Sequence, residues 1–269
     1  MNMKTSNTRK MFQIGVAAAV AVMVNLAGVQ AAVIADWQFS SAETLLDDSS
    51  VNNYTLANTG GVTWSAADGG SAVFNGSAML NTVATLDLSS YTQITIAWGM
   101  RTTQTAGAIV WEQSSNAFST PNGLYSAIND SPGVGTIDLL ANRGGAGGTG
   151  DAVIGYTTIP AGGTLHSYAM EVNGPATWTG QINLFVDGVD VTGSYYDIFT
   201  QNSWTQTFLN DTFNIGARSG VIVGFNGSMD YLTISTNSVP EPSTWAMAAL
   251  LGLTLLVAWG RRFPGLKNL

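Results

Sequence analysis

The chain has 269 residues, of which 45% are hydrophobic and 10% aromatic, and its formal net charge is −8 at pH 7. This hydrophobic content can bury a substantial core, which excludes an intrinsically disordered chain. Charged residues make up only 10%, and there are 31 glycines, a composition typical of many short strands joined by tight turns. Cysteine is absent, so disulfides, thiolate metal sites and a cysteine nucleophile are excluded.

The charge is distributed unevenly along the chain. Residues 32–239 contain sixteen acidic residues, three arginines and no lysine, which gives this region a net charge of −13. A surface of this sign repels the phosphates of nucleic acids and favours solubility or divalent cations. We therefore exclude nucleic acid as a partner.

The first 31 residues have the three parts of an export signal. A positively charged start precedes an apolar run at residues 11–28, and small residues follow at a cleavage site between Ala31 and Ala32. This order predicts a secretory signal peptide at residues 1–31. The alternative is an uncleaved signal anchor, and in both cases the bulk of the chain is exported.

The last segment, residues 239–269, also has three parts. The triplet Pro240-Glu241-Pro242 precedes an apolar run at residues 245–259 and a basic tail at residues 261–269. A helix over the apolar run would rise ~22 Å, short of a ~30 Å hydrocarbon core, so we expect a marginal membrane span. The arginines that follow predict a cytoplasmic tail, with everything before the span outside.

This tail resembles the PEP-CTERM sorting signal of Gram-negative bacteria. The resemblance implies that a membrane-embedded exosortase recognises Pro240, Glu241 and Pro242 and removes the tail. It also implies an inner-membrane intermediate that is delivered to the cell surface or the exopolysaccharide matrix. The alternative is an ordinary tail anchor with a proline-containing stalk.

Between the two ends, residues 32–238 show period-two alternation and no long 3.6-residue periodicity, which predicts strands. Residues 93–100 alternate most clearly, and residues 181–187 alternate up to Asp187-Gly188, a hairpin dipeptide. The other predicted strands are residues 33–39, 71–74, 108–112, 123–128, 136–141, 152–157, 165–172, 212–215 and 225–235. This pattern predicts one domain, an all-β, antiparallel two-sheet jelly-roll sandwich.

The strand at residues 225–235 has an irregular pattern. Leu232 and Ile234 share one face, but Met229 is out of phase with them by one residue. If all three are buried, a β-bulge is needed near Asp230, and it would redirect the carboxylate of this residue.

Short motifs follow one another along the whole exported region. They are Ala35-Asp36-Trp37-Gln38-Phe39, Asp48-Ser49-Ser50, Ala72-Val73-Phe74-Asn75-Gly76-Ser77, Leu86-Asp87-Leu88-Ser89, Leu165-His166-Ser167-Tyr168, Leu184-Phe185-Val186-Asp187-Gly188, Phe213-Asn214-Ile215-Gly216 and Phe225-Asn226-Gly227-Ser228-Met229-Asp230. In this order they resemble the laminin-G-like, concanavalin A-like domains of bacterial surface proteins, which implies a jelly-roll fold. Leu165 departs from the family's usual tryptophan, and Tyr231 stands where an acidic residue is common.

Few residues suit catalysis. His166 is the only histidine, so a site with two or three histidine ligands is excluded, and no G-x-S-x-G elbow is present. Glycoside hydrolysis needs two carboxylates on either side of the scissile bond, and neither Glu112 nor Glu171 has an acidic neighbour two to four residues away. We predict a non-enzymatic protein, with a glycan-cleaving enzyme built on an Asp-based pair as one alternative.

Two kinds of binding site are candidates. Asp48 and Asp230 lie near opposite ends of the exported region and could together bind calcium through oxygen ligands; the alternative is that both are solvated turn residues. Four aromatic residues in polar stretches could stack on sugar rings; the alternative is that they cap the sandwich ends. These residues are Trp178, Tyr195, Tyr196 and Trp204.

Together these features predict an exported surface or matrix protein that binds or organises polysaccharide. A structural matrix protein without a glycan ligand is the other alternative.

Overall fold

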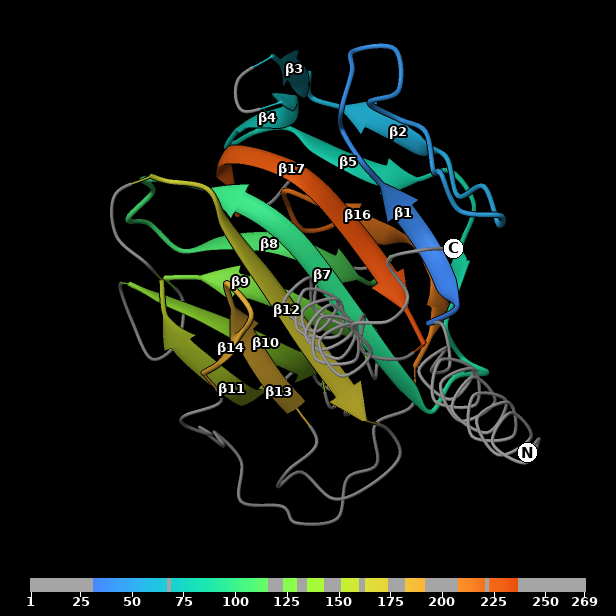
Figure 1. Ribbon diagram of the computed structural model, residues 1–269, viewed down its shortest axis with the longest axis vertical. Coiled ribbons are helices and arrows are strands. Elements are labelled where there is room, and N and C mark those ends of the chain that lie inside the picture. Colours follow the sequence, from blue (N-terminus) through green and yellow to red (C-terminus); the bar gives the residue numbers. More distant parts are fainter. Residues whose placement is uncertain are drawn as a thin grey trace, which may run out of the picture.

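The computed structural model describes residues 31–66, 69–115, 123–129, 135–142, 151–159, 163–173, 182–191, 208–220 and 223–236. Their regular structure is almost entirely β-strand, arranged as two sheets that lie one in front of the other (Figure 1). None of these residues belongs to a helix long and apolar enough to cross a membrane. The predicted signal peptide, apart from Ala31, and the predicted sorting segment lie outside the described residues.

The larger sheet has eight strands and is the front layer of Figure 1. Its order is β14 (Val189–Asp190), β13 (Ile182–Val186), β12 (His166–Asn173), β7 (Gln93–Arg101), β17 (Asn226–Ser235), β4 (Ser71–Asn75) and β3 (Thr63–Ser65), and β1 (Val33–Trp37) also pairs with β17. The long strands β17, β7 and β12 therefore form the centre of this layer.

The smaller sheet has seven strands and lies behind the first. Its order is β11 (Asp151–Thr158), β10 (Thr136–Asn142), β9 (Leu124–Ile128), β8 (Ala108–Gln113), β16 (Phe213–Ile215), β5 (Met79–Thr82) and β2 (Leu56–Thr59). A separate pair joins β15 (Asn210–Asp211) to β6 (Leu86–Asp87). The pairings between these strands are antiparallel, so the prediction of an antiparallel two-sheet sandwich is confirmed for the described residues.

All eleven strands predicted from the alternation are present, with ends that differ by one or two residues. The strands that the sequence did not reveal are short ones, β2, β3, β5, β6, β14 and β15, each two to four residues long. Alternation is recognised over about four to eight residues, so elements at or below the lower end of this range give only a weak signal.

A chain of aromatic contacts runs through the core and joins the two sheets. Trp37 stacks on Phe213 with ring centroids 5.8 Å apart, and Phe213 stacks on Trp111 at 5.7 Å. Trp111 then meets Trp98 edge-on at 5.9 Å, and Trp98 stacks on Tyr168 at 5.6 Å. These rings are almost fully buried, so they add specific aromatic contacts to a large burial of apolar surface.

The predicted irregularity in β17 is confirmed. Met229 pairs with Met100, whereas Tyr231 pairs with Gly99, so Asp230 is an extra residue in the strand. The register shift allows Met229 to be fully buried together with Leu232 and Ile234. The bulge thus reconciles the apolar pattern with a single core.

The predicted hairpin at Asp187-Gly188 is confirmed as well. Val186 pairs with Val189, and the two residues between them have positive φ angles, 50° for Asp187 and 77° for Gly188. Positive φ at both central positions is the requirement of a type I′ turn, and the Asp-Gly dipeptide satisfies it. This turn fixes where the Asp187 side chain lies.

Candidate functional site on the larger sheet

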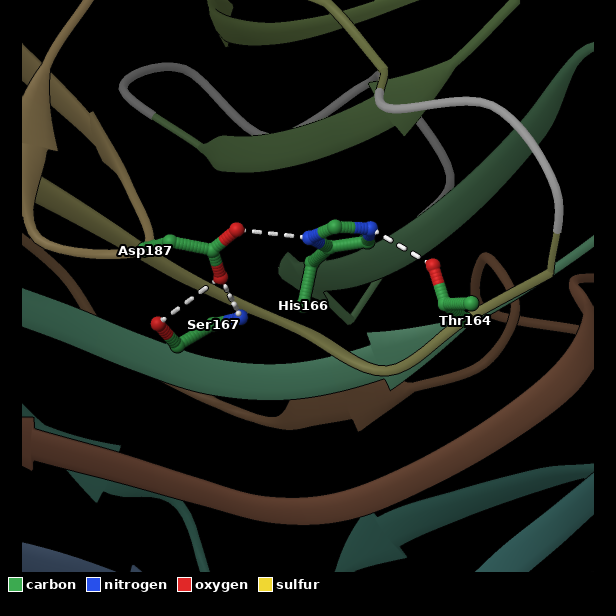
Figure 2. A network of polar contacts seen from close by, with 4 residues as sticks. All are labelled: Thr164, His166, Ser167 and Asp187. Carbon is green, nitrogen blue, oxygen red and sulfur yellow. Dashed lines mark hydrogen bonds and ion pairs between the residues drawn. The ribbon is translucent and has the colours of Figure 1, made fainter.

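A polar network forms where β12 begins, around His166 (Figure 2). The Nδ1 atom of His166 lies 2.6 Å from Oδ2 of Asp187, and its Nε2 atom lies 2.8 Å from Oγ1 of Thr164. The second carboxylate oxygen of Asp187 accepts the backbone N–H of Ser167 at 2.9 Å. The network therefore ties the turn after β13 to the start of β12 and fixes the imidazole between two partners.

Asp187 remains a negative charge at this surface at neutral pH. Burial alone would raise the pKa of its carboxyl, but the hydrogen bonds from His166 and from Ser167 outweigh burial, so the pKa of Asp187 lies below its ordinary value. Half of its side chain is exposed. A ligand that approaches this end of the sheet therefore meets an ionised carboxylate.

The order hydroxyl, imidazole, carboxylate in Thr164, His166 and Asp187 is that of a hydrolase triad. Such triads act beside preorganised hydrogen-bond donors in a site from which water is excluded. Here Thr164 is exposed and the Asp187 side chain is half exposed. We interpret these hydrogen bonds as structural: they hold the His166 ring and the hairpin turn in fixed positions.

Next to this network, two apolar side chains cover a glycine. The Cε1 atom of Tyr231 lies only 2.7 Å, and the Cδ1 atom of Leu165 3.6 Å, from the point where a Cβ atom on Gly99 would be. Tyr231 is partly exposed and Leu165 is 41% exposed. We name these three residues the Tyr231 platform; Leu165 and Tyr231 are the two positions at which the sequence departs from the laminin-G-like pattern.

Beside the platform, the outward side chains of β7 and β12 are small. Ala97 pairs with Ala169, and Ser167 pairs with Gly99. Ala97, Ala169 and Ser167 are partly exposed, while the residues that alternate with them on both strands enter the core. We name these four residues the small-residue strip. On the side of the strip away from Tyr231, Phe185 of β13 pairs with Ala169 and is partly exposed. The aromatic rings of Tyr231 and Phe185 therefore flank the strip on its two sides.

The bulge residue completes this neighbourhood. Asp230 Oδ1 accepts a hydrogen bond from Nη2 of Arg101 at 3.2 Å. Burial raises the pKa of Asp230, and the Arg101 charge opposes this only in part. The pKa of Tyr231 is raised by burial and by the charges of Asp230 and Asp187, so its ring stays a neutral phenol.

The two carboxylates predicted to bind calcium have separate protein partners. Asp48 accepts the backbone N–H groups of Asp36 at 2.8 Å, Ser50 at 2.8 Å and Tyr54 at 2.6 Å, and also the Ser50 hydroxyl at 2.8 Å. Asp230 pairs with Arg101. In the part of the chain that the structure describes, no group of three or more His, Cys, Asp or Glu residues could hold a metal ion.

The other predicted site residues lie outside the described residues. They are the aromatic candidates Trp178, Tyr195, Tyr196 and Trp204 and the sorting triplet Pro240, Glu241 and Pro242. Of the tryptophans that are described, Trp37, Trp98 and Trp111 are fully buried in the core, and Trp64 is partly buried.

A buried charged cluster on the smaller sheet had no sequence signal. Glu112 is 2% exposed; its Oε1 atom lies 3.7 Å from Nε of Arg218, and its Oε2 atom accepts the backbone N–H of Ser219 at 3.0 Å. The Arg218 guanidinium lies over the Tyr125 ring, 5.0 Å from its centroid. Glu171 accepts a hydrogen bond from Asn183 at 3.1 Å, so both glutamates have partners other than carboxylates.

Neither a protein-family model nor a curated protein matches this chain. Among solved structures, it is similar to domain 4 of AbnA, a GH43 extracellular arabinanase from Geobacillus stearothermophilus, in complex with arabinotriose. The TM-score is 0.58 at 18% identity, over 80% of this chain and 97% of that domain. It is also similar to the binding domain of botulinum neurotoxin DC in complex with SialylT, with a TM-score of 0.54 at 12% identity.

The chain aligns over 77% of its own length with about half of the neurotoxin binding domain, 48%. At these identities the likeness concerns the fold. The chain therefore has the jelly-roll-like β-sandwich architecture of these domains, consistent with a concanavalin A-like fold.

Proposed function

We propose that the chain is an exported, non-catalytic protein that binds polysaccharide at the cell surface or in the extracellular matrix. The observation that carries this is the Tyr231 platform. A partly exposed aromatic ring and Leu165 offer an apolar surface to the face of a sugar, and the ionised Asp187 beside them can accept hydrogen bonds from hydroxyl groups.

The comparisons support the same proposal. The arabinanase domain, solved with arabinotriose, shares the fold over nearly its full length, and the neurotoxin binding domain was solved with SialylT. A β-sandwich of this kind is therefore an architecture on which oligosaccharide sites have been built, although a shared fold alone does not fix a function.

The arrangement of carboxylates favours binding over cleavage. A glycosidase needs two carboxyl groups placed on either side of the scissile bond. Glu112 instead pairs with Arg218, Glu171 with Asn183, and Asp230 with Arg101. Release of reducing sugar ends from a bound polysaccharide would overturn the non-catalytic part of the proposal.

The test of binding uses the full-length protein in mild detergent on a glycan array, with and without Ca²⁺. We expect saturable binding that Tyr231→Ala weakens about tenfold and that Tyr231→Phe keeps, because the phenylalanine retains the ring. A blank array with a well-folded protein would favour a structural matrix role without a glycan ligand.

We also propose that residues 1–31 direct export and that an exosortase cleaves at Pro240-Glu241-Pro242, after the apolar segment 245–259 has held an inner-membrane intermediate. Mass spectrometry of the protein from a Gram-negative host, with and without an exosortase, tests this. We expect loss of the tail only with the exosortase, and its retention in Glu241→Ala. Equal processing in both hosts would contradict the sorting proposal.

A further inference from the structure

The outer face of the larger sheet has an arrangement of side chains that suits a linear ligand. Tyr231 of β17 lies over Gly99 of β7, and Phe185 lies on β13, with β12 between β7 and β13. Because the Tyr231 ring lies over Gly99 of β7, two interstrand spacings of about 4.8 Å and a shift of two residues along the strands separate it from Phe185, so the two rings are roughly 12 Å apart. This separation exceeds the size of a single sugar ring.

The sheet surface between the rings of Tyr231 and Phe185 carries only small side chains. Between them lie Ala97, Ser167 and Ala169 of the small-residue strip, which carry no side chain larger than a hydroxymethyl group. The fourth member, Gly99, lies under the Tyr231 ring. A ligand that stacks on both rings can therefore lie close to the sheet backbone.

The charges along this face are negative. Asp187 stands at one end of the strip, and Glu171 is partly exposed on β12 towards the other. The nearby cation, Arg101, is held by Asp230. The exported region as a whole has three arginines and sixteen acidic residues, so an anionic ligand is repelled both locally and at long range.

We infer that this face binds an internal stretch of a polysaccharide of uncharged or amino-bearing sugars, lying across β17, β7, β12 and β13 with Tyr231 and Phe185 as its two stacking points. This inference rests on the proposed function and names its ligand class. Uronic acid chains are excluded by Asp187 and Glu171. Amino sugars gain from the same carboxylates.

Calorimetry of the full-length protein tests the length dependence. The probes are oligomers of one to six units of arabinose, glucose and N-acetylglucosamine. We expect affinity to rise up to about three units and then to level off, because chains of that length span both rings. Phe185→Ala should bring the longer oligomers down to the affinity of short ones, and Tyr231→Ala should weaken binding about tenfold.

Charge selectivity is tested with hexamers of galacturonate and of glucosamine. We expect tighter binding of the glucosamine hexamer, weakened by added salt, and no binding of the galacturonate hexamer. Asp187→Asn should reduce this discrimination. The matched control is Asp47→Asn, which removes an exposed carboxylate in the loop after β1 and should leave it unchanged.

The outcomes separate the two proposals. Binding of a monomer as tightly as a tetramer, preference for galacturonate, or full affinity in a folded Phe185→Ala variant would overturn this inference and leave glycan binding intact. If no oligomer binds to wild-type protein that is shown to be folded by a cooperative thermal melt, both this inference and the proposed function are overturned.

Discussion

The ring of Tyr231 lies over Gly99 of the neighbouring strand, with Cε1 only 2.7 Å from where a β-carbon on Gly99 would stand. Gly99 does not have the positive φ of a turn glycine, so its lack of a side chain matters for space rather than for backbone conformation. The Tyr231 ring therefore occupies the space above the sheet that a side chain at position 99 would take.

Gly99→Ala should therefore displace the Tyr231 ring. We expect a loss of about 1–3 kcal/mol in the free energy of unfolding, as for other overpacked sites, together with weaker glycan binding. Chemical denaturation measures the first effect and calorimetry the second.

The double variant Gly99→Ala/Tyr231→Ala provides the control. Once the ring is removed, the added methyl group has room, so the two changes should be less than additive. Additive losses would mean that the ring and the glycine do not interact as described.

The pH dependence of stability follows from Asp187. Its pKa in the folded chain lies below the ordinary value of 3.8, so ionised Asp187 stabilises the fold above that value, and this contribution is lost as the pH falls through the folded-state pKa. Asp187→Asn should therefore melt at a lower temperature than the wild type at pH 7. The difference should shrink below about pH 3.8. Thermal melts of both proteins from pH 7 to pH 2 measure it, and a difference that is constant with pH would contradict the role of the carboxylate charge.

Much of the fold could be predicted from local patterns, whereas the site could not. The alternation in residues 93–100, the Asp187-Gly188 turn and the phase error at Met229 each depend on neighbours in the sequence, and the structure has all three features. The Tyr231 platform depends on the register between β17 and β7, strands more than 120 residues apart. The two departures from the family pattern, at Leu165 and Tyr231, were the only sequence signal for it.

The Glu112 cluster could not be predicted from the sequence for the same reason, because its members are far apart in the chain. Its arginine comes from a segment about a hundred residues later in the chain, and no periodicity connects the two. The partners of Asp48 could not be predicted either, because the sequence shows its carboxylate but not the backbone N–H groups that surround it.

The aromatic contacts of the core should dominate its stability. Trp111 touches both Phe213 and Trp98 and therefore links the two sheets. We expect Trp111→Ala to cost about 3–5 kcal/mol, the usual range for a large buried aromatic. Trp64→Ala is the comparison, since this ring is only partly buried, and it should cost clearly less. Equal losses in urea denaturation would contradict the central position of Trp111.

Asp48 should stabilise the fold without a metal ion. Its carboxylate is 7% exposed and accepts four hydrogen bonds from Asp36, Ser50 and Tyr54. Asp48→Ala leaves the three backbone N–H donors without their acceptor, at a cost in the free energy of unfolding of about 1–3 kcal/mol for each donor that stays buried. Asp47→Asn, one residue away and exposed, should have little effect. Because the oxygens of Asp48 already have protein partners, a chelator should not change the melting temperature of the wild type. A chelator that lowers the melting temperature, with recovery on adding Ca²⁺, would instead mean that a cation contributes to the fold.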